Sequence, residues 1–189
     1  MKKNPALSGF IYALLAAVAA FAVYFFFLAK RDYFLVDNPT PQTFYFRLNN
    51  GSEKIITAGQ FIKVDLKKGK NAIKVFDRNK KMLYDSTFTV GKERGLLNIT
   101  HSDYYIHKQF YGYNLKRDSL LMSMNKTIID GQEYYGEPRL MNRMYTEDFY
   151  YNVDEDYDKV IKNIQKVESR DKIFRKQDFL NYYKEYYKF

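Results

Sequence analysis

The chain has 189 residues, with 31 Lys and Arg against 22 Asp and Glu and a net charge of +9. It contains no Cys, which excludes disulfides and thiolate-ligated metal sites, and no Trp, but it has 19 Tyr and 16 Phe. The basic residues come singly or in pairs, so the sequence lacks the clustered basic stripe of a nucleic-acid-binding protein.

An uncharged apolar run, ALSGFIYALLAAVAAFAVYFFFLA, occupies residues 6–29. As a helix this run would measure about 36 Å, which exceeds the hydrocarbon core of a bilayer, about 30 Å thick. The run therefore predicts one transmembrane helix within an anchor of residues 1–31. The rival interpretation is a signal peptide cleaved after the A-x-A sequence at residues 17–19. It fits less well, because the apolar segment of a signal peptide has about 7–15 residues.

The charges that flank the apolar run predict its orientation. Lys2, Lys3 and the α-amino group precede the run, and Lys30 and Arg31 follow it. Positive charge favours the cytoplasmic side, so the slight N-terminal excess places residues 32–189 outside the cytoplasm. The sequence thus predicts a single-pass protein of the bacterial inner membrane with a periplasmic domain.

Small residues follow one face of the expected helix at spacings of three and four. Such residues let a second helix approach closely, which predicts that a membrane-protein partner packs against this face. The residues of the face are Gly9, Ala13, Ala16, Ala17 and Ala20.

Residues 32–100 show the pattern of a small antiparallel β-sandwich. Apolar and polar side chains alternate in FYFRL (44–48), FIKVDL (61–66) and MLYDSTFTV (82–90). Turn signals separate these segments, and Asn50-Gly51 is a strong hairpin signal because a type I′ turn requires positive φ at both central residues. Alternation with turns roughly every 8–12 residues is typical of a sandwich.

The sequence ITAGQFIKVDLKKGKNAIKVFD at residues 56–77 combines two glycine-bearing turns with two alternating strands. In this order it resembles the PEGA-like and transthyretin-like β-sandwich modules of membrane-anchored bacterial envelope proteins. Modules of that kind are mostly non-catalytic, so the resemblance implies a role in adhesion or assembly.

Residues 101–152 form an aromatic-rich continuation in which we expect three to five further strands. Asp130-Gly131 predicts another hairpin between TII and EYY. Not every ring of the stretch YYIHKQFYGY can face one core, so we expect some of them to contact a partner. The candidate partner-binding residues are Tyr104, Tyr105, Phe110, Tyr111 and Tyr113. The alternative is that these rings cover a thin core.

Residues 153–189 change to a helical period and predict two helices. The first would present one apolar face, made of Tyr157, Val160, Ile161, Ile164 and Val167. The second would begin near Asp178, a plausible N-cap, and bury Phe179 and several tyrosines.

The histidines offer the first candidate chemistry, and its geometry is unfavourable. His101, Ser102 and Asp103 are consecutive, and consecutive strand residues point to alternate faces, so they cannot form a nucleophilic triad among themselves. In an unbroken strand His107 would share a face with His101 but lie roughly 20 Å away, too far to ligate the same metal.

The acidic sequence DEDYD at residues 154–158 resembles the start of a calcium loop. The EF-hand pattern then requires Gly and Glu where this chain has Lys159 and Gln165. The start of a helix explains these acids better, because the positive end of the helix dipole favours carboxylates. No phosphate-binding glycine motif occurs, and we expect no metal and no cofactor.

These features predict a mainly β fold with one transmembrane helix, a small antiparallel sandwich and two C-terminal helices. The expected function is a non-enzymatic, membrane-anchored subunit or scaffold of a bacterial envelope complex. It would bind its partners through the anchor and the aromatic-rich domain, without nucleic acid. The alternative is a module that binds glycan or peptidoglycan, with the same tyrosines stacked on sugar rings.

Overall fold

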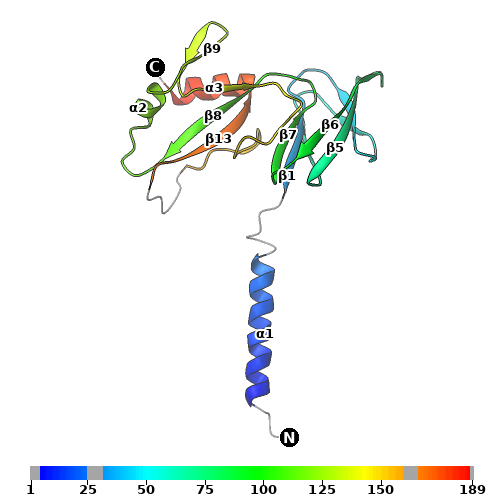
Figure 1. Ribbon diagram of the computed structural model, residues 1–189, viewed down its shortest axis with the longest axis vertical. Helices are drawn as coiled ribbons and strands as arrows, with labels where there is room; N and C mark the ends of the chain where they lie inside the picture. Colours follow the sequence, from blue (N-terminus) through cyan, green and yellow to red (C-terminus); the bar gives the residue numbers. More distant parts are fainter. Residues whose placement is uncertain (1–4, 25–31, 160–165, 188–189) are drawn as a thin grey trace. The chain divides into compact units, whose positions relative to one another are not determined.

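The computed structural model describes residues 5–24, 32–159 and 166–187, and the chain divides into two units, residues 1–32 and 33–189. The first unit contains helix α1, Pro5–Val23. Within its described residues, the second unit contains strands β1 to β13 and helices α2 and α3 (Figure 1). The prediction of a mainly β fold is therefore confirmed.

The predicted membrane anchor is contradicted. None of the helices in the described residues is both long enough and apolar enough to cross a bilayer. Helix α1 has 19 residues and ends at Val23. Residues 25–29 of the predicted span lie outside the described residues. The predicted inner-membrane location depended on that span and is contradicted by the same finding.

The small-residue face of the predicted anchor lies in α1. Its five residues, Gly9, Ala13, Ala16, Ala17 and Ala20, are all exposed within their own unit. Their packing against a second helix stays a prediction.

The first sheet of the second unit lies at its centre. Its strand order is β12-β7-β1-β4, and its bounds are Tyr145–Thr146, Arg94–Asn98, Tyr33–Asp37 and Phe61–Val64. Strand β1 pairs antiparallel with β4 and parallel with β7. The prediction of a purely antiparallel sandwich is therefore wrong. Phe34 and Val36 enter one core while Leu35 enters another. The apolar run of β1 is typical of a strand that is covered on both faces.

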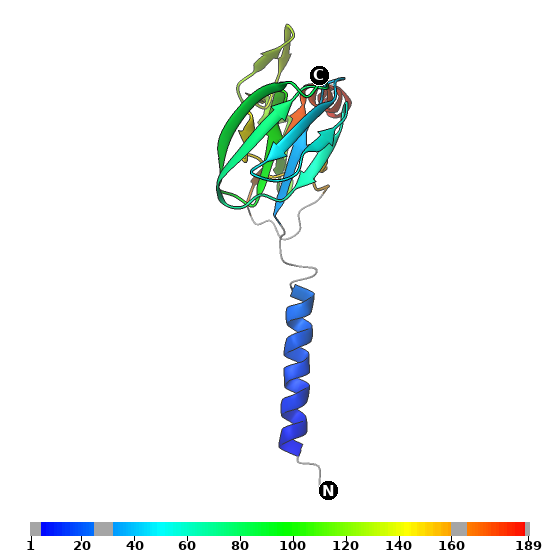
Figure 2. The same cartoon turned by 90° about the vertical axis from the view of Figure 1, so that its right-hand side faces the viewer.

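The second sheet closes a β-sandwich with the first. Its order is β3-β2-β5-β6, with bounds Lys54–Ile56, Phe44–Leu48, Gly69–Phe76 and Met82–Val90. The predicted alternation is confirmed, because Phe46, Ile73 and Val75 point into the core shared with the first sheet. Figure 2 is turned so that this side of the molecule faces the viewer.

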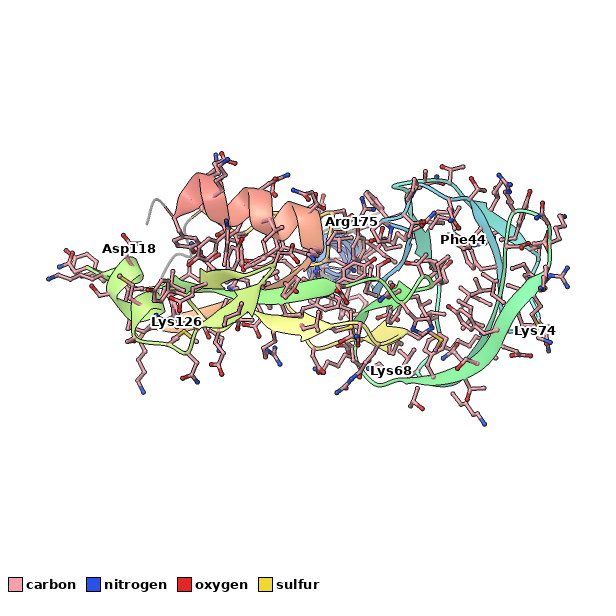
Figure 3. The ribbon with its side chains drawn as sticks, turned by 90° about the horizontal axis from the view of Figure 1, so that it is seen from above. Phe44, Lys68, Lys74, Asp118, Lys126 and Arg175 are labelled. Atoms are coloured by element: carbon pink, nitrogen blue, oxygen red, sulfur yellow. The ribbon has the colours of Figure 1, made fainter. Side chains whose placement is uncertain are left out.

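The third sheet packs on the other face of the first sheet. Its order is β11-β8-β13, with bounds Arg139–Met141, Tyr104–Tyr111 and Glu168–Arg175. Tyr104, Ile106 and Ile173 pack against Leu35 and Leu96 of the first sheet. Helix α3, Lys176–Tyr186, covers the opposite face of the third sheet. Figure 3 shows α3 and the third sheet beside the sandwich that carries Phe44 and Lys74.

Two predicted hairpins are present, and one has a shifted turn. Strands β9, Thr127–Ile129, and β10, Gln132–Tyr134, join through Asp130 and Gly131, whose φ values are +52° and +81° as a type I′ turn requires. The turn after β2 begins one residue earlier than expected. Gly51 N donates to the Leu48 carbonyl at 2.9 Å, and Asn49 takes the positive φ, which asparagine tolerates.

The predicted pair of C-terminal helices is confirmed only in its second member. Helix α3 buries Phe179 and Tyr183, although it begins two residues before Asp178, which does not cap it. In the first member, Tyr157 lies in a loop, and residues 160–165 lie outside the described residues. Residues 168–175 form β13 because they pair with β8 along their whole length. This long-range pairing overrides the local helical pattern.

Candidate functional site

The aromatic stretch that the sequence singled out forms strand β8 and lies mainly in the core. Tyr104, Tyr105 and Tyr111 are only 0%, 6% and 1% exposed, so their rings are not available to a partner. Phe110 is half-buried, and Tyr113, at 89% exposed, is the accessible member of the predicted set. The interpretation of this stretch as an interaction surface needs correction. Strand β8 is sandwiched between the first sheet and α3, and both of its faces are covered.

The two histidines are placed differently. His101 is exposed and has a φ of +52° in the turn before β8, with its ring 5.3 Å from that of Tyr84. His107 lies within β8 and is buried. Because the strand begins at Tyr104, the unbroken strand that would place both histidines on one face does not exist.

His107 is enclosed by aromatic rings. The rings of Phe179, Tyr182, Tyr183 and Tyr187 have centroids 5.7 to 6.3 Å from its imidazole. Burial lowers the pKa of His107 to about 4, so the ring is neutral at physiological pH.

The two ring nitrogens of His107 differ in their contacts. The Tyr157 hydroxyl donates to the His107 carbonyl at 2.6 Å and lies 3.4 Å from Nδ1. Nε2 has no hydrogen-bond partner among the described residues, and a Cβ at Gly136 would lie 3.1 Å from it. Nε2 is thus turned toward the backbone at Gly136, into packed structure.

A second buried polar group ties the sandwich to the third sheet. The Asp37 carboxylate, 0% exposed, accepts a hydrogen bond from the Tyr104 hydroxyl at 2.6 Å and another from Arg175 Nε at 2.9 Å. Arg175 Nη2 also donates to Asp37 Oδ1 and, at 3.0 Å, to the Gly59 carbonyl. The hydrogen bond to Asp37 raises the pKa of Arg175. This arrangement is a structural connection, because every donor and acceptor named here has a partner within the chain.

A cleft of about 800 Å³ opens between α3, β13 and residues 153–159. Aromatic side chains on its wall include Tyr157, Phe174, Tyr182 and Tyr186. Its lining also carries five carboxylates and two lysines, a net charge of −3. Flat rings with carboxylate and amide groups suit a neutral polyhydroxyl or a cationic ligand, and they disfavour an anion.

Lys172 is a basic residue in the lining of this cleft. Its side chain is nearly buried, with Nζ 4.6 Å from the Phe174 ring centroid and 3.6 Å from an Asp156 oxygen. Burial lowers the pKa of Lys172, and the nearby Asp156 carboxylate opposes that shift. His107 opposes Lys172 in the strand pairing, yet it is not part of the cleft lining.

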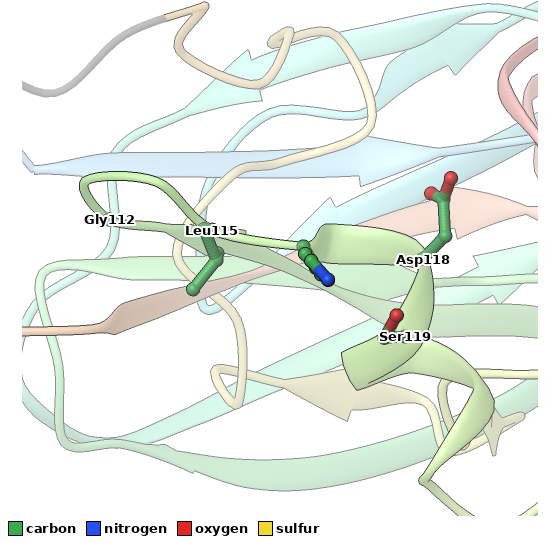
Figure 4. A pocket seen from close by; sticks show the side chains of 5 residues that line it. Gly112, Leu115, Asp118 and Ser119 are labelled. Carbon is green, nitrogen blue, oxygen red and sulfur yellow. The ribbon is translucent and has the colours of Figure 1, made fainter.

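A shallower pocket of about 590 Å³ lies beside α2, Arg117–Met122 (Figure 4). It is lined by Gly112, Leu115, Lys116, Asp118 and Ser119. Lys116 and Asp118 are its charged lining residues, one of each sign, so the pocket has no strong electrostatic preference.

The outer face of the second sheet carries an apolar strip that crosses all four strands. The strand register places Ile55 of β3 opposite Tyr45 of β2, and Tyr45 opposite Phe76 of β5. Phe76 lies opposite Met82 of β6, where a register shift between Val75 and Phe76 interrupts the alternation of the β5–β6 pair. Ile55 and Met82 are exposed, and Tyr45 and Phe76 are half-buried. We call these four residues the apolar strip.

Basic side chains surround the apolar strip. Lys80 Nζ lies 4.9 Å from the Tyr45 ring centroid, and Arg47 Cζ lies 5.5 Å from that of Phe76. Both cations also contact Glu53, at 2.8 Å and 3.1 Å. The hydrogen bond from Lys80 lowers the pKa of Glu53. A carboxylate is therefore already accommodated on this face at hydrogen-bonding distance from two cations.

The charge of the chain is concentrated in the segment that forms this sheet. Residues 44–90 carry ten Lys and Arg against four Asp and Glu, a net charge of +6. Residues 91–189 carry 17 basic and 16 acidic side chains, a net charge of +1. The second sheet is thus the basic part of the domain, whereas the cleft beside α3 is acidic.

Sequence reasoning missed the apolar strip, although a signal was present. Successive strand residues point to opposite faces, so two adjacent apolar residues in a strand that covers one core must leave one of them outside. Such pairs occur at Ile55-Ile56 and Val75-Phe76. Met82 and Leu83 are both exposed, at the point where the β5–β6 register shifts. Tyr45 similarly stands between the inward-pointing Phe44 and Phe46.

Within the described ranges, no group of three or more His, Asp or Glu side chains is arranged to hold a metal ion. Comparison of the chain with protein-family models, with curated proteins and with solved structures finds no match. The resemblance to PEGA-like and transthyretin-like modules therefore stays a prediction.

Proposed function

We propose that this chain is a non-enzymatic binding subunit, or scaffold, of a protein complex, and that a partner docks on the outer face of its second sheet. The apolar strip carries this proposal. Scattered apolar side chains are common on protein surfaces, but a contiguous exposed patch with a polar rim marks an interaction site. The strip is contiguous because its four residues are register neighbours on adjacent strands.

The residue types of the strip and its rim suit a protein interface. Tyr, Phe, Met and Arg are enriched at the centre of interfaces, where burial of their side chains provides most of the binding energy. The surrounding basic residues would accelerate association with an acidic partner and make it dependent on salt. On docking, Lys80 and Arg47 would exchange their contacts with Glu53 for contacts with the partner's carboxylates.

Met82→Glu is expected to abolish this docking. It places a carboxylate in a desolvated interface, and the loss of one well-packed apolar contact there costs about 2 kcal/mol or more, or about thirtyfold in affinity. The measurement is the stoichiometry of proteins that co-purify with the tagged full-length chain from its native cell.

Met122→Glu is the matched control, because Met82 and Met122 are both 51% exposed and Met122 lies on α2, away from the strip. A partner lost with Met82→Glu and kept with Met122→Glu supports the proposal. Equal retention of every partner by both variants would contradict it, provided that circular dichroism shows both to be folded.

The cleft beside α3 favours a second candidate function, the binding of glycan. Its rings, carboxylates and amides are the groups that stack on and hydrogen-bond to sugars. Tyr186→Ala removes an exposed ring from this cleft and is expected to weaken retention on purified peptidoglycan. Tyr113→Ala removes an exposed ring that does not line the cleft and is expected to leave retention unchanged. Retention that is absent, or equal in both variants, rejects this function.

A further inference from the structure

Strand β6, Met82–Val90, is the edge of the second sheet and has nine residues. It pairs with β5 on one side only. Among the described residues no strand pairs with its other side, and no loop backbone hydrogen-bonds to it there. In an antiparallel pair, alternate backbone groups point away from the neighbouring strand. The outer edge of β6 therefore presents a row of N–H and C=O groups that can receive another strand.

The other edge strands within the described ranges are short or covered. Strands β3, β4, β11 and β12 have three, four, three and two residues. Strand β13 has eight residues, but residues 150–151 cover part of its edge, since Tyr150 N donates to Asp171 O and Ile173 N donates to Tyr151 O. The open edge of β6 is exceptional in this domain.

The sequence of β6 lacks the features that proteins use to protect an edge. MLYDSTFTV contains no Pro and no Lys, and its one charged residue, Asp85, pairs with Lys74 on β5 at 3.1 Å. Natural edge strands usually carry Lys, Pro or a bulge, or are very short, because these features prevent pairing with other chains. The pairing of β6 with β5 has one irregularity, between Val75 and Phe76, and the register from Tyr84 to Val90 is regular. This regular stretch without Lys or Pro indicates an edge that can pair with another strand.

The two faces of β6 define the side chains that an added strand would meet. Tyr84, Phe88 and Val90 lie on the core side, so apolar side chains would be buried beside them. On the outer side the neighbouring strand β5 presents Lys70 and Lys74, and Lys80 and Lys81 are exposed in the preceding turn. The outward row of β6 itself contains Asp85, which Lys74 already neutralises, and the uncharged Thr87 and Thr89. An added strand with apolar residues on the core side and acidic residues opposite the threonines matches both rows.

We propose that β6 receives an extended acidic segment of a partner protein as a fifth strand of the second sheet. This proposal rests on the proposed function and deepens it, because Met82 belongs to both β6 and the apolar strip. A second copy of the chain is a poorer occupant. Strand β6 itself carries one charge, Asp85, but pairing β6 with β6 would bring together two second sheets. Residues 44–90, which include these sheets, carry a net charge of +6 in each copy, so long-range repulsion opposes this pairing.

The test uses the full-length protein and a ten-residue peptide of alternating valine and glutamate, blocked at both ends. Binding is followed by fluorescence anisotropy, and the location of binding by amide hydrogen exchange. We expect saturable binding that protects amides in β6. A peptide with lysine in place of glutamate should not bind. Methylation of alternate peptide nitrogens on the pairing edge should abolish binding without changing any side chain.

Variants of the protein test the same edge. Thr87 and Thr89 are exposed on β6. The double variant Thr87→Glu, Thr89→Glu should lower the affinity for the acidic peptide by on the order of tenfold, because it places like charges opposite the peptide. The double variant Thr87→Lys, Thr89→Lys is the control, which should bind at least as tightly as the unmodified protein.

Several outcomes would overturn the proposal. They are failure of the acidic peptide to bind, binding that survives backbone methylation, and protection confined to residues outside β6. Concentration-dependent dimerisation with protected β6 amides would assign the edge to a second copy instead. If Met82→Glu loses a native partner while β6 stays unprotected by the peptide, the proposed function stands and the strand-addition proposal fails.

Discussion

Replacing Arg175 with methionine is expected to lower the free energy of unfolding by about 3–5 kcal/mol, the range for removing one partner of a buried ion pair. The reason is the position of Asp37, whose carboxylate is fully buried in β1. Without Arg175, the hydroxyl of Tyr104 is the one side-chain hydrogen-bond donor that this carboxylate keeps among the described residues. The measurement is the midpoint of urea unfolding of the full-length protein at an unchanged slope.

An adjacent ion pair provides the control. Lys176 contacts Asp130 at 2.7 Å, but both side chains are substantially exposed. Lys176→Met is expected to cost no more than about 1 kcal/mol, because solvent screens surface pairs. The combined variant Asp37→Leu, Arg175→Met should recover part of the loss, because it removes the uncompensated charge. Equal stabilities for Arg175→Met and Lys176→Met would contradict this interpretation.

The Asp37–Arg175 contact also joins two layers of the fold. Asp37 belongs to β1 in the first sheet and Arg175 ends β13 in the third sheet. The contact fixes how the third sheet lies on the sandwich, with Tyr104 of β8 bound to the same carboxylate. Apolar packing alone would allow the two layers to slide, whereas a bidentate pair has one geometry.

The stability of the protein is expected to fall as the pH is lowered from about 6.5 toward about 4, and His107 is expected to cause a distinct part of the fall. Burial lowers the pKa of His107 from 6.5 to about 4 in the folded state. Between these values the unfolded chain binds a proton that the folded protein does not, so unfolding is favoured as pH falls. The contribution is fully present above pH ~6.5 and is lost by pH ~4, a change of about 3 kcal/mol.

His107→Phe should flatten this part of the pH dependence, and its aromatic ring suits the surrounding cluster. His101→Phe is the matched control, because it replaces an exposed imidazole instead of a buried one. The measurement is the free energy of unfolding in urea at several pH values, compared between each variant and the unmodified protein. Carboxylates that titrate in the same range cancel in this comparison. An identical slope in His107→Phe and the unmodified protein would show that His107 is not buried as a neutral ring.

The sandwich could be predicted because its determinants are local. Alternation in residues 44–48 and 82–90 fixes which side chains enter the core, and the dipeptide Asp130-Gly131 fixes a turn through its two positive φ values. The parallel pairing of β1 with β7 could not be predicted, because residues 33–37 and 94–98 are far apart in the chain and nothing local specifies their register. Strand β13 was missed for the same reason, since its pairing with β8 is a long-range contact.

The candidate site was less predictable than the fold. The composition shows that the chain is rich in aromatic residues, but it does not show which of their rings the third sheet buries. Tyr104 and Tyr105 are core residues only because both faces of β8 are covered, by the first sheet and by α3 respectively. The apolar strip required the register of four strands before its residues became neighbours. The membrane anchor was predicted from the length of an apolar run, but none of the helices in the described residues is long and apolar enough to cross a bilayer.

Hydroxyl-radical footprinting of the native complex shows whether a partner covers the outer face of the second sheet. Met82 and Met122 are oxidised readily when exposed, and both are 51% exposed in the isolated chain. We expect the oxidation of Met82, Tyr45 and Phe76 to fall in the complex, while the oxidation of Met122 stays unchanged. Protection of Met122 with full oxidation of Met82 would contradict the proposed function, because the partner would then occupy a different face.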